Sequence, residues 1–154
     1  MKRITFAILS LCFSGIVHAT DCFDLAGRDY HIDPDLLRAV AWNESRFNPV
    51  AIGKNSDKSI DVGVMQINSQ HFPLLGSVGI TKDHLIKDAC MNIYTGAYFL
   101  AQAFTKWGVN WQAVGAYNAG FKKNDTQAIR RYNYARKIES TYRAIKASKV
   151  VAPH

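Results

Sequence analysis

Residues 88–108 read DACMNIYTGAYFLAQAFTKWG and give the strongest indication of the fold class. Its apolar residues recur at the spacing of one helix face, in the stripe Ile93, Ala97, Leu100, Ala101, Phe104 and Trp107. The spacing predicts a long helix that starts near Asp88 and stops before Gly108. A helix with so continuous an apolar stripe belongs in the core, and the rest of the chain is expected to pack around it.

Helical spacing also dominates on both sides of this stretch, and no run of two-residue alternation is long enough to build an extended sheet. Upstream, the pattern predicts a short helix over residues 21–30. A second helix follows, which Asp33 can cap and Pro34 can begin, and which Asn48-Pro49 is expected to end.

A polar stretch then leads into residues 61–68 and indicates a loop or hairpin around residues 53–68. Downstream of the core helix, residues 111–117 form a further helical segment, and the last helix runs from about Thr126 through Ile145. The sequence therefore predicts a mostly α, single-domain protein with one small loop or hairpin segment.

The first residues are typical of an export signal. Lys2 and Arg3 precede an apolar run over residues 4–17, which is shorter than the roughly 20 residues that a membrane-spanning helix needs. We expect a cleaved signal peptide at residues 1–19 and one domain at residues 20–154. A permanent anchor is the alternative. Export by this route predicts a periplasmic protein.

Signal cleavage removes one of the three cysteines, Cys12, and leaves Cys22 and Cys90. A bulky Leu11 precedes Cys12, which disfavours a lipid anchor there. In an oxidising compartment an even pair of cysteines is expected to form a disulfide, and two buried free thiols are the alternative. The chain has no C-x-x-C pair, so redox catalysis has no support.

The formal net charge of +7 indicates an anionic partner. Sign alone does not distinguish nucleic acid, an acidic membrane surface and an acidic polymer. Nine basic and two acidic residues lie between residues 122 and 149, either as a solvated helix surface or as a face that attracts an anionic cell-wall polymer. Nucleic acid is disfavoured as the partner because an exported protein rarely meets it.

Glu44 is the first candidate for chemistry because it shares a helix face with Leu37 and Val40. Burial there raises the pKa of the carboxyl group, as a general acid working near neutral pH requires. The alternatives are an ion pair with Arg46 or Arg38, or a side chain turned toward solvent.

Asp61 offers a second carboxylate, and a pair of carboxylates is the minimal equipment for cleaving a glycosidic bond. The alternative for Asp61 is a turn residue that caps its own backbone. His31, His71 and His84 lack metal-ligand spacing, and the chain has no phosphate-loop or dinucleotide fingerprint. No metal or cofactor is therefore predicted.

Four motifs together carry a resemblance to a known family. They are Glu44-Ser45, the tetrad at residues 63–66, the segment 116–120 (AYNAG) and the segment 134–138 (YARKI). In this order they resemble lytic transglycosylases with a goose-type-lysozyme-like (SLT) catalytic domain, over nearly all of residues 22–140. The resemblance implies a lysozyme-like fold. The small size, the cysteine pair and residues 61–68 look most like the specialised branch associated with type III or type IV secretion systems and pili.

The resemblance implies a peptidoglycan substrate and cleavage of the β-1,4 bond between N-acetylmuramic acid and N-acetylglucosamine. Glu44 matches the catalytic acid of the family, which then acts as base on the muramyl C6 hydroxyl and yields a 1,6-anhydro product. The residues that match positions lining the sugar cleft or supporting the acid are Ser45, Gly63, Met65, Gln66, Tyr117, Asn118 and Tyr134. Implied partners are glycan strands and a secretion-system or pilus component, for a monomer without cofactor or lasting membrane anchor.

Asp61 departs from the family pattern, since many members have no acidic residue there. Lysozymes that hydrolyse with two carboxylates do have one, so a hydrolytic muramidase that uses Glu44 and Asp61 is the alternative reading. Our hypothesis is that Asp61 stabilises positive charge at C1 while the product stays mainly anhydro. A non-catalytic cell-wall-binding scaffold and a nucleic-acid-binding domain are rival readings from other classes.

Overall fold

The computed structural model describes residues 21–151, and the predicted signal peptide lies outside them. In chain order the elements are α1 (Cys22–Tyr30), α2 (Pro34–Ser45), β1 (Ile52–Lys54), β2 (Ile60–Val62), β3 (Ile67–Asn68), the 3-10 helix η1 (Ser69–His71), α3 (Phe72–Ser77), α4 (Lys82–Lys87), α5 (Ala89–Trp107), α6 (Trp111–Ala119) and α7 (Asp125–Val151). The predicted mostly α single domain is confirmed. Among these described elements, no helix is both long and apolar enough to cross a membrane.

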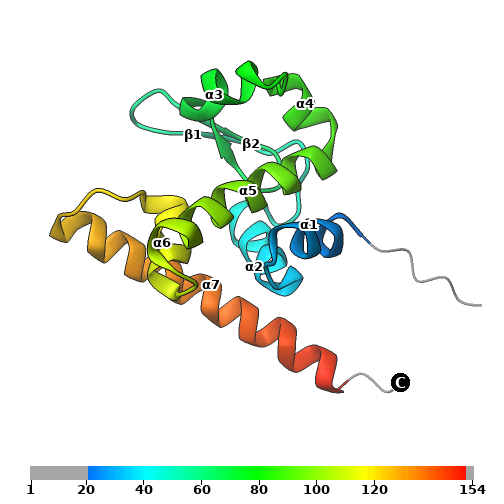
Figure 1. Ribbon diagram of the computed structural model, residues 1–154, viewed down its shortest axis with the longest axis vertical. Helices are drawn as coiled ribbons and strands as arrows, with labels where there is room; N and C mark the ends of the chain where they lie inside the picture. The colour runs from blue at the N-terminus through cyan, green and yellow to red at the C-terminus, as the bar shows by residue number, and fades with distance from the viewer. Residues whose placement is uncertain (1–20, 152–154) are drawn as a thin grey trace, which may run out of the picture.

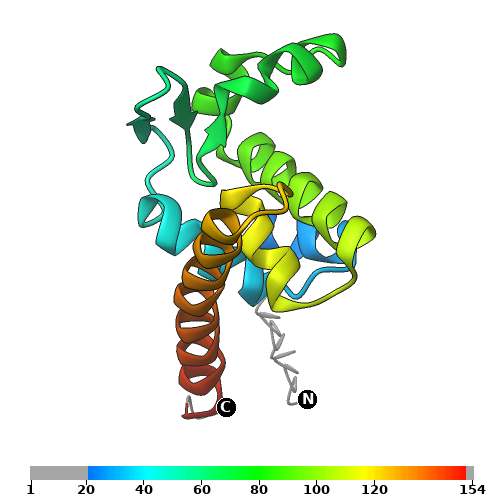
Figure 2. The same ribbon diagram turned by 90° about the vertical axis from the view of Figure 1, so that its left-hand side faces the viewer.

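Helix α5 runs through the middle of the molecule (Figure 1). The sheet, α3 and α4 lie on one side of it, and α1, α2, α6 and α7 lie on the other, as the turned view also shows (Figure 2). The sheet is antiparallel in the order β1-β2-β3, with Val62 of β2 opposite both Ile52 and Ile67. The expected hairpin around residues 53–68 is thus a small three-stranded sheet.

The boundaries of α5 confirm the prediction from its apolar stripe. The side chain of Asp88 accepts a hydrogen bond from the Met91 N–H at 2.9 Å and so caps the first turn. Gly108, with φ of 78°, ends the helix. Ala97 and Leu100 are completely buried, so the stripe is the core-facing side of the helix.

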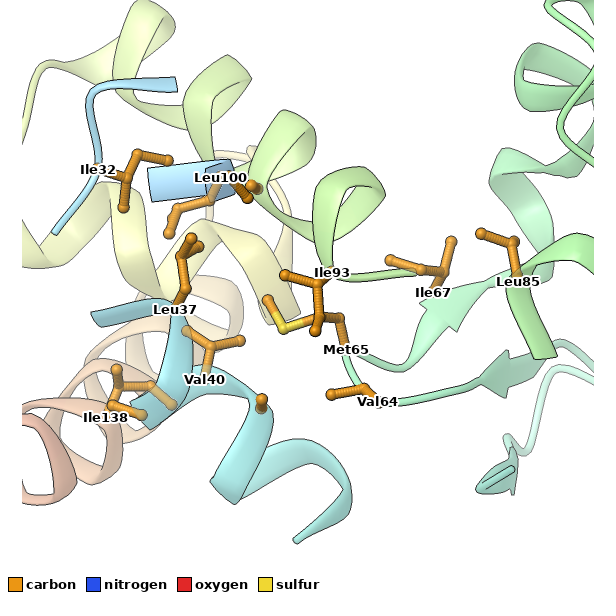
Figure 3. Packing of buried hydrophobic residues seen from close by; sticks show 14 of the residues in the cluster. Ile32, Leu37, Val40, Val64, Met65, Ile67, Leu85, Ile93, Leu100 and Ile138 are labelled. Atoms are coloured by element: carbon orange, nitrogen blue, oxygen red, sulfur yellow. The ribbon is translucent and has the colours of Figure 1, made fainter. Parts of the chain in front are cut away.

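One continuous apolar core joins the two sides of the molecule (Figure 3). Leu37, Val40, Leu100 and Ile138 are completely buried among the helices, and Ile67 and Leu85 are buried near the sheet. Met65 and Ile93 lie between these two groups (Figure 3). The loop between β2 and β3 is therefore fixed against α2 and α5 by core packing.

Helix α2 ends earlier than the sequence predicts. Its last residue is Ser45, four residues before Pro49, and Arg46 and Phe47 follow with φ of 55° and 63°. The guanidinium of Arg46 lies over the ring of Trp42 at 4.5 Å, and the Phe47 ring packs against Trp42 with centroids 5.7 Å apart. These stacking contacts accompany the left-handed turn that stops the helix before the proline is reached.

Helices α3 and α4 were not expected from the sequence. Each has six residues, which is too short for a helical period to stand out. Thr81 caps α4 by accepting a hydrogen bond from the His84 N–H at 3.2 Å. Together they carry the chain from the sheet back to the start of α5 (Figure 1).

The predicted disulfide is present and ties the first helix to the core helix. Cys22 begins α1 and Cys90 lies in the first turn of α5, with their Cα atoms 5.4 Å apart. The bond closes a loop that spans 68 positions. This loop contains α2 and the whole sheet, so the disulfide limits the freedom of the unfolded chain over that region.

Part of the basic surface on α7 is taken up by ion pairs. The amine of Lys146 lies 3.0 Å from a carboxylate oxygen of Asp33, and that of Lys149 lies 2.6 Å from Asp35. These contacts fasten the second half of α7 to the start of α2. The basic segment is therefore partly structural.

Candidate active site

Glu44 lies in the last turn of α2, four residues after the buried Val40. Its side chain is half-buried, and the hydroxyl of Tyr134 in α7 donates a hydrogen bond to Oε1. Arg38 instead pairs with Asp21, as well as with Asp24 and Asp35. Among residues 21–151 no ion pair is formed by Glu44, so the expectation of a carboxyl facing the interior is confirmed.

Burial raises the pKa of the Glu44 carboxyl from 4.5 to about 7. The negative charge of Asp61 acts in the same direction. The hydrogen bond from Tyr134 and the positive charge of Lys137 oppose them, because both favour the carboxylate. A group that titrates near neutral pH is suited both to donate and to accept a proton.

The Asp61 carboxylate is held in place by two asparagine amides. Asn55 Nδ2 donates to Asp61 Oδ2 and Asn68 Nδ2 donates to Asp61 Oδ1, each at 2.8 Å. Ser59 Oγ accepts from both amides at 3.1 Å and so links them. Asp61 therefore belongs to a side-chain network on the sheet and does not cap its own backbone. The negative charge of Asp61 raises the pKa of Glu44, so the two carboxyl groups lie near enough to interact electrostatically.

Side chains of three helices form hydrogen bonds with the backbone of the loop over residues 63–66. From α2, the hydroxyl of Ser45 donates to the carbonyl of Val64 at 2.7 Å. From α6, the hydroxyl of Tyr117 donates to the carbonyl of Met65 at 2.8 Å. From α5, the completely buried Asn92 accepts from the Met65 N–H at 2.7 Å. The loop is thus held rigidly beside Glu44.

Gly63 and Gln66 take backbone conformations with φ of 77° and 50°. A Cβ added to Gly63 would lie 2.1 Å from Asn92 Nδ2, so the packing of Asn92 alone demands glycine here. The Gln66 amide folds back and donates to the carbonyls of Gly63 and Ala51 at 2.9 and 3.2 Å. Both residues shape the loop. Their predicted contact with a saccharide stays a prediction.

Met65, Tyr117 and Asn118 differ in how they reach the site. The Met65 side chain has no exposed surface and packs against Gly96, so in this structure it contributes through its backbone. The Tyr117 side chain is partly buried, whereas Asn118 is exposed at the end of α6. The part that these residues take in binding a substrate likewise stays a prediction.

Burial and the nearby Glu44 charge raise the pKa of both Tyr117 and Tyr134 well above the usual range. Both phenols therefore stay protonated at neutral pH and remain donors. The structure brings them, Glu44, Ser45 and the residue 63–66 loop together from four separate parts of the chain. Of the residues that the described chain contributes, no group of three metal-ligating side chains has the arrangement of a metal site.

Asn92 is a site residue that sequence reasoning missed. Besides the Met65 N–H, its amide reaches the carbonyls of Val62 and Leu85, at 2.9 and 3.0 Å. The signal was present in the sequence as an amide next to Ile93 of the apolar stripe in the core helix. A buried polar side chain in such a helix needs partners, and these partners turn out to be the backbone of the loop beside Glu44.

We expect the Tyr134→Phe variant to raise the pKa of Glu44 further above about 7, by roughly one unit. The reason is that the phenol donates to the carboxylate form, which loses this stabilisation in the variant. Asp61→Asn is the matched variant and lowers the same pKa, because it removes a repelling charge. An NMR titration of the isotope-labelled carboxyl measures both, and shifts in the same direction contradict the assignment.

Comparisons with known proteins show the family to which the chain is similar. The family model described as "Transglycosylase SLT domain" matches residues 21–140. The X polypeptide of Escherichia coli strain K12 is 57% identical over 149 residues, which cover 97% of this chain and 88% of that protein. Invasion protein IagB of Salmonella typhimurium strain SL1344 is 41% identical over 126 residues, covering 82% of this chain and 78% of that protein.

A solved structure is also similar, that of an inactive mutant of lytic transglycosylase Slt from Pseudomonas aeruginosa. Its TM-score is 0.63 at 21% sequence identity, and the match covers 86% of this chain and 24% of that chain. At this identity the likeness concerns the fold alone. It confirms the lysozyme-like fold that the four motifs implied.

Proposed function

The chain belongs to the transglycosylase SLT family, and we propose that it is an active peptidoglycan lytic transglycosylase. The bond cleaved is the β-1,4 link between N-acetylmuramic acid and N-acetylglucosamine, and the product carries a 1,6-anhydro end. The observation that carries this proposal is the Glu44 carboxyl, half-buried, with a pKa near 7 and a tyrosine hydroxyl on one of its oxygens.

In the first step the protonated Glu44 donates its proton to the glycosidic oxygen. The C1–O4 bond then breaks, the N-acetylglucosamine side leaves as an alcohol, and positive charge develops at the muramyl C1. The substrate's own acetamido group and the Asp61 carboxylate stabilise that charge. Glu44 is left as a carboxylate, which the Tyr134 hydroxyl stabilises.

In the second step the Glu44 carboxylate accepts the proton of the muramyl C6 hydroxyl. The C6 oxygen attacks C1 and forms the C1–O6 bond, so no water is consumed and Glu44 returns to its protonated form. One carboxyl group near neutral pKa serves both proton transfers. The hydrogen bonds from Ser45 and Tyr117 keep the adjacent loop fixed during this sequence.

The expected product of sacculus digestion is a muropeptide with a 1,6-anhydro end. Mass spectrometry separates this outcome from hydrolysis, because hydrolysed fragments are one water heavier and have free reducing ends. Asp61→Asn is the informative variant, and we expect it to slow cleavage without changing the product. Heavier fragments from the unmodified enzyme would assign it instead as a muramidase that uses Asp61, and no cleavage at all would favour a cell-wall-binding scaffold.

We further propose that the enzyme is periplasmic and opens the wall locally for assembly of a secretion system or pilus. The apolar N-terminal segment, the branch that the motifs resemble and the relative named as an invasion protein support this role. Complementation of a deletion strain tests it. The unmodified gene is expected to restore assembly and a Glu44→Gln gene is not, whereas restoration by both removes cleavage from the role.

A further inference from the structure

One face of α7 carries two cations on either side of Tyr134. Arg130, Tyr134 and Lys137 follow one another at i, i+4 and i+7, which places them on one side of a helix. Thr141 continues this side, and its hydroxyl accepts from the Asn43 amide at 2.9 Å, next to Glu44 in α2. The face therefore looks toward the end of α2 that bears the catalytic acid.

We call Arg130 and Lys137 the cation pair. Seven residues of helix separate them by about 10 Å along the axis, and Tyr134 lies between them. Both side chains are exposed. The positive charge of Lys137 is felt at Glu44, where it favours the carboxylate. The pair thus flanks the tyrosine that donates a hydrogen bond to Glu44.

Four other cations of α7 have structural partners, and Arg136, which forms no ion pair among the described residues, lies two positions from Tyr134 and so on another side of the helix. Arg131 is buried and donates to the carbonyls of Gly120 and Lys122 at 3.1 and 2.9 Å. Arg143 pairs with Glu139 at 2.6 Å. Lys146 and Lys149 pair with Asp33 and Asp35 at the start of α2, as described above.

The cation pair differs from these four partnered cations. Over residues 21–151, no ion pair is formed by Arg130 or by Lys137. Holding two exposed like charges beside a reaction centre gives no stability to the fold. Their position is explained if the substrate supplies the negative charge.

Peptidoglycan offers such a charge at each muramyl unit, whose lactyl group carries a short peptide with free carboxylates. A strand that places its muramyl C1 at Glu44 also brings this peptide beside the cleft. Resting on the proposed function, we propose that Arg130 and Lys137 bind the peptide carboxylates and make the enzyme selective for peptide-bearing strands over bare glycan.

Three substrates separate charge from bulk. They are intact sacculi, sacculi whose carboxylates have been converted to uncharged amides, and glycan strands stripped of peptide by an amidase, with the lactyl carboxylates that this frees also converted to amides. We expect Arg130→Gln and Lys137→Gln each to lower kcat/KM on intact sacculi about three- to fivefold at low salt, as for the loss of one exposed ion pair. On the other two substrates we expect the same kcat/KM for these variants as for the unmodified enzyme. On intact sacculi, Lys137→Arg keeps the positive charge and is expected to keep the kcat/KM that Lys137→Gln loses.

Matched controls test whether overall charge is the cause. Lys87→Gln removes an exposed lysine of α4 that pairs with Asp83. Arg143→Gln removes an exposed arginine of α7, the helix that carries the cation pair. Both variants are expected to cleave intact sacculi like the unmodified enzyme. If they lose activity to the same extent as the cation-pair variants, the attraction is a general effect of net charge and the proposal is wrong.

A binding measurement keeps this proposal separate from the proposed function. In the Glu44→Gln background, co-sedimentation with intact and amidated sacculi reports binding without cleavage. We expect the cation-pair substitutions to weaken binding about three- to fivefold on intact sacculi only. Equal binding to intact and amidated sacculi overturns the carboxylate proposal, even if the enzyme cleaves. Stronger binding to intact sacculi supports the carboxylate proposal. If the unmodified enzyme then cleaves neither kind of sacculus, the proposed function is overturned instead.

Discussion

Replacing Glu44 by Gln lowers the rate of sacculus cleavage about 100- to 10,000-fold, the usual worth of a positioned general acid and base. Gln has nearly the same shape and still accepts the hydrogen bond from Tyr134, but its amide has no acidic proton to transfer to the glycosidic oxygen. Release of anhydro-muropeptides, followed by chromatography, measures the loss. A variant that keeps more than about a tenth of the activity removes Glu44 from the role of acid.

The fold of this variant is checked by its thermal stability as a function of pH. Because burial raises the pKa of Glu44 from 4.5 to about 7, the folded state disfavours the ionised form. The unmodified protein therefore loses stability as the pH rises from 4.5 to about 7. Gln does not titrate, so the Tm of the variant relative to the unmodified protein is expected to increase between about pH 5 and about pH 8.

Replacing Asn92 by Ala lowers the free energy of unfolding by about 3–5 kcal/mol. The change leaves the buried Met65 N–H and the carbonyls of Val62 and Leu85 without their partner, and each unsatisfied buried group costs about 1–3 kcal/mol. Denaturant unfolding followed by circular dichroism measures the difference. A loss below about 1 kcal/mol would show that the loop does not depend on this amide.

Gln102→Ala is the matched control for Asn92→Ala. It removes an amide side chain from the same helix at an exposed position, and its effect is expected to stay within about 0.5 kcal/mol. Asn92→Ala is also expected to lower kcat, because Tyr117 and Ser45 hold the same loop and lose their fixed partner. Unchanged kinetics in a folded Asn92→Ala variant would separate the loop's stability from catalysis.

The sequence predicts an element of the fold well where its apolar residues keep one spacing over many turns. The stripe of α5 predicted a helix whose ends agree with Ala89 and Trp107, since core burial acts on every turn of it. The end of α2 was predicted too late, because stacking of Arg46 and Phe47 on Trp42 outweighs the more distant proline signal. Short helices α3 and α4 gave no period to read.

The spacing and the residue types favoured the helical class, a disulfide between Cys22 and Cys90 and burial of Glu44, and they showed the family motifs in their order. How these parts come together is visible in the tertiary structure alone. Three features depend on contacts that the spacing of residues does not reveal. They are the hydrogen bond from the Met65 N–H to Asn92, the two asparagine amides that bind Asp61, and the ion pairs that engage some cations of α7 and leave others without a partner within residues 21–151. Such contacts leave no periodic trace in the sequence, since a side chain's partner is chosen by the packing of the whole core.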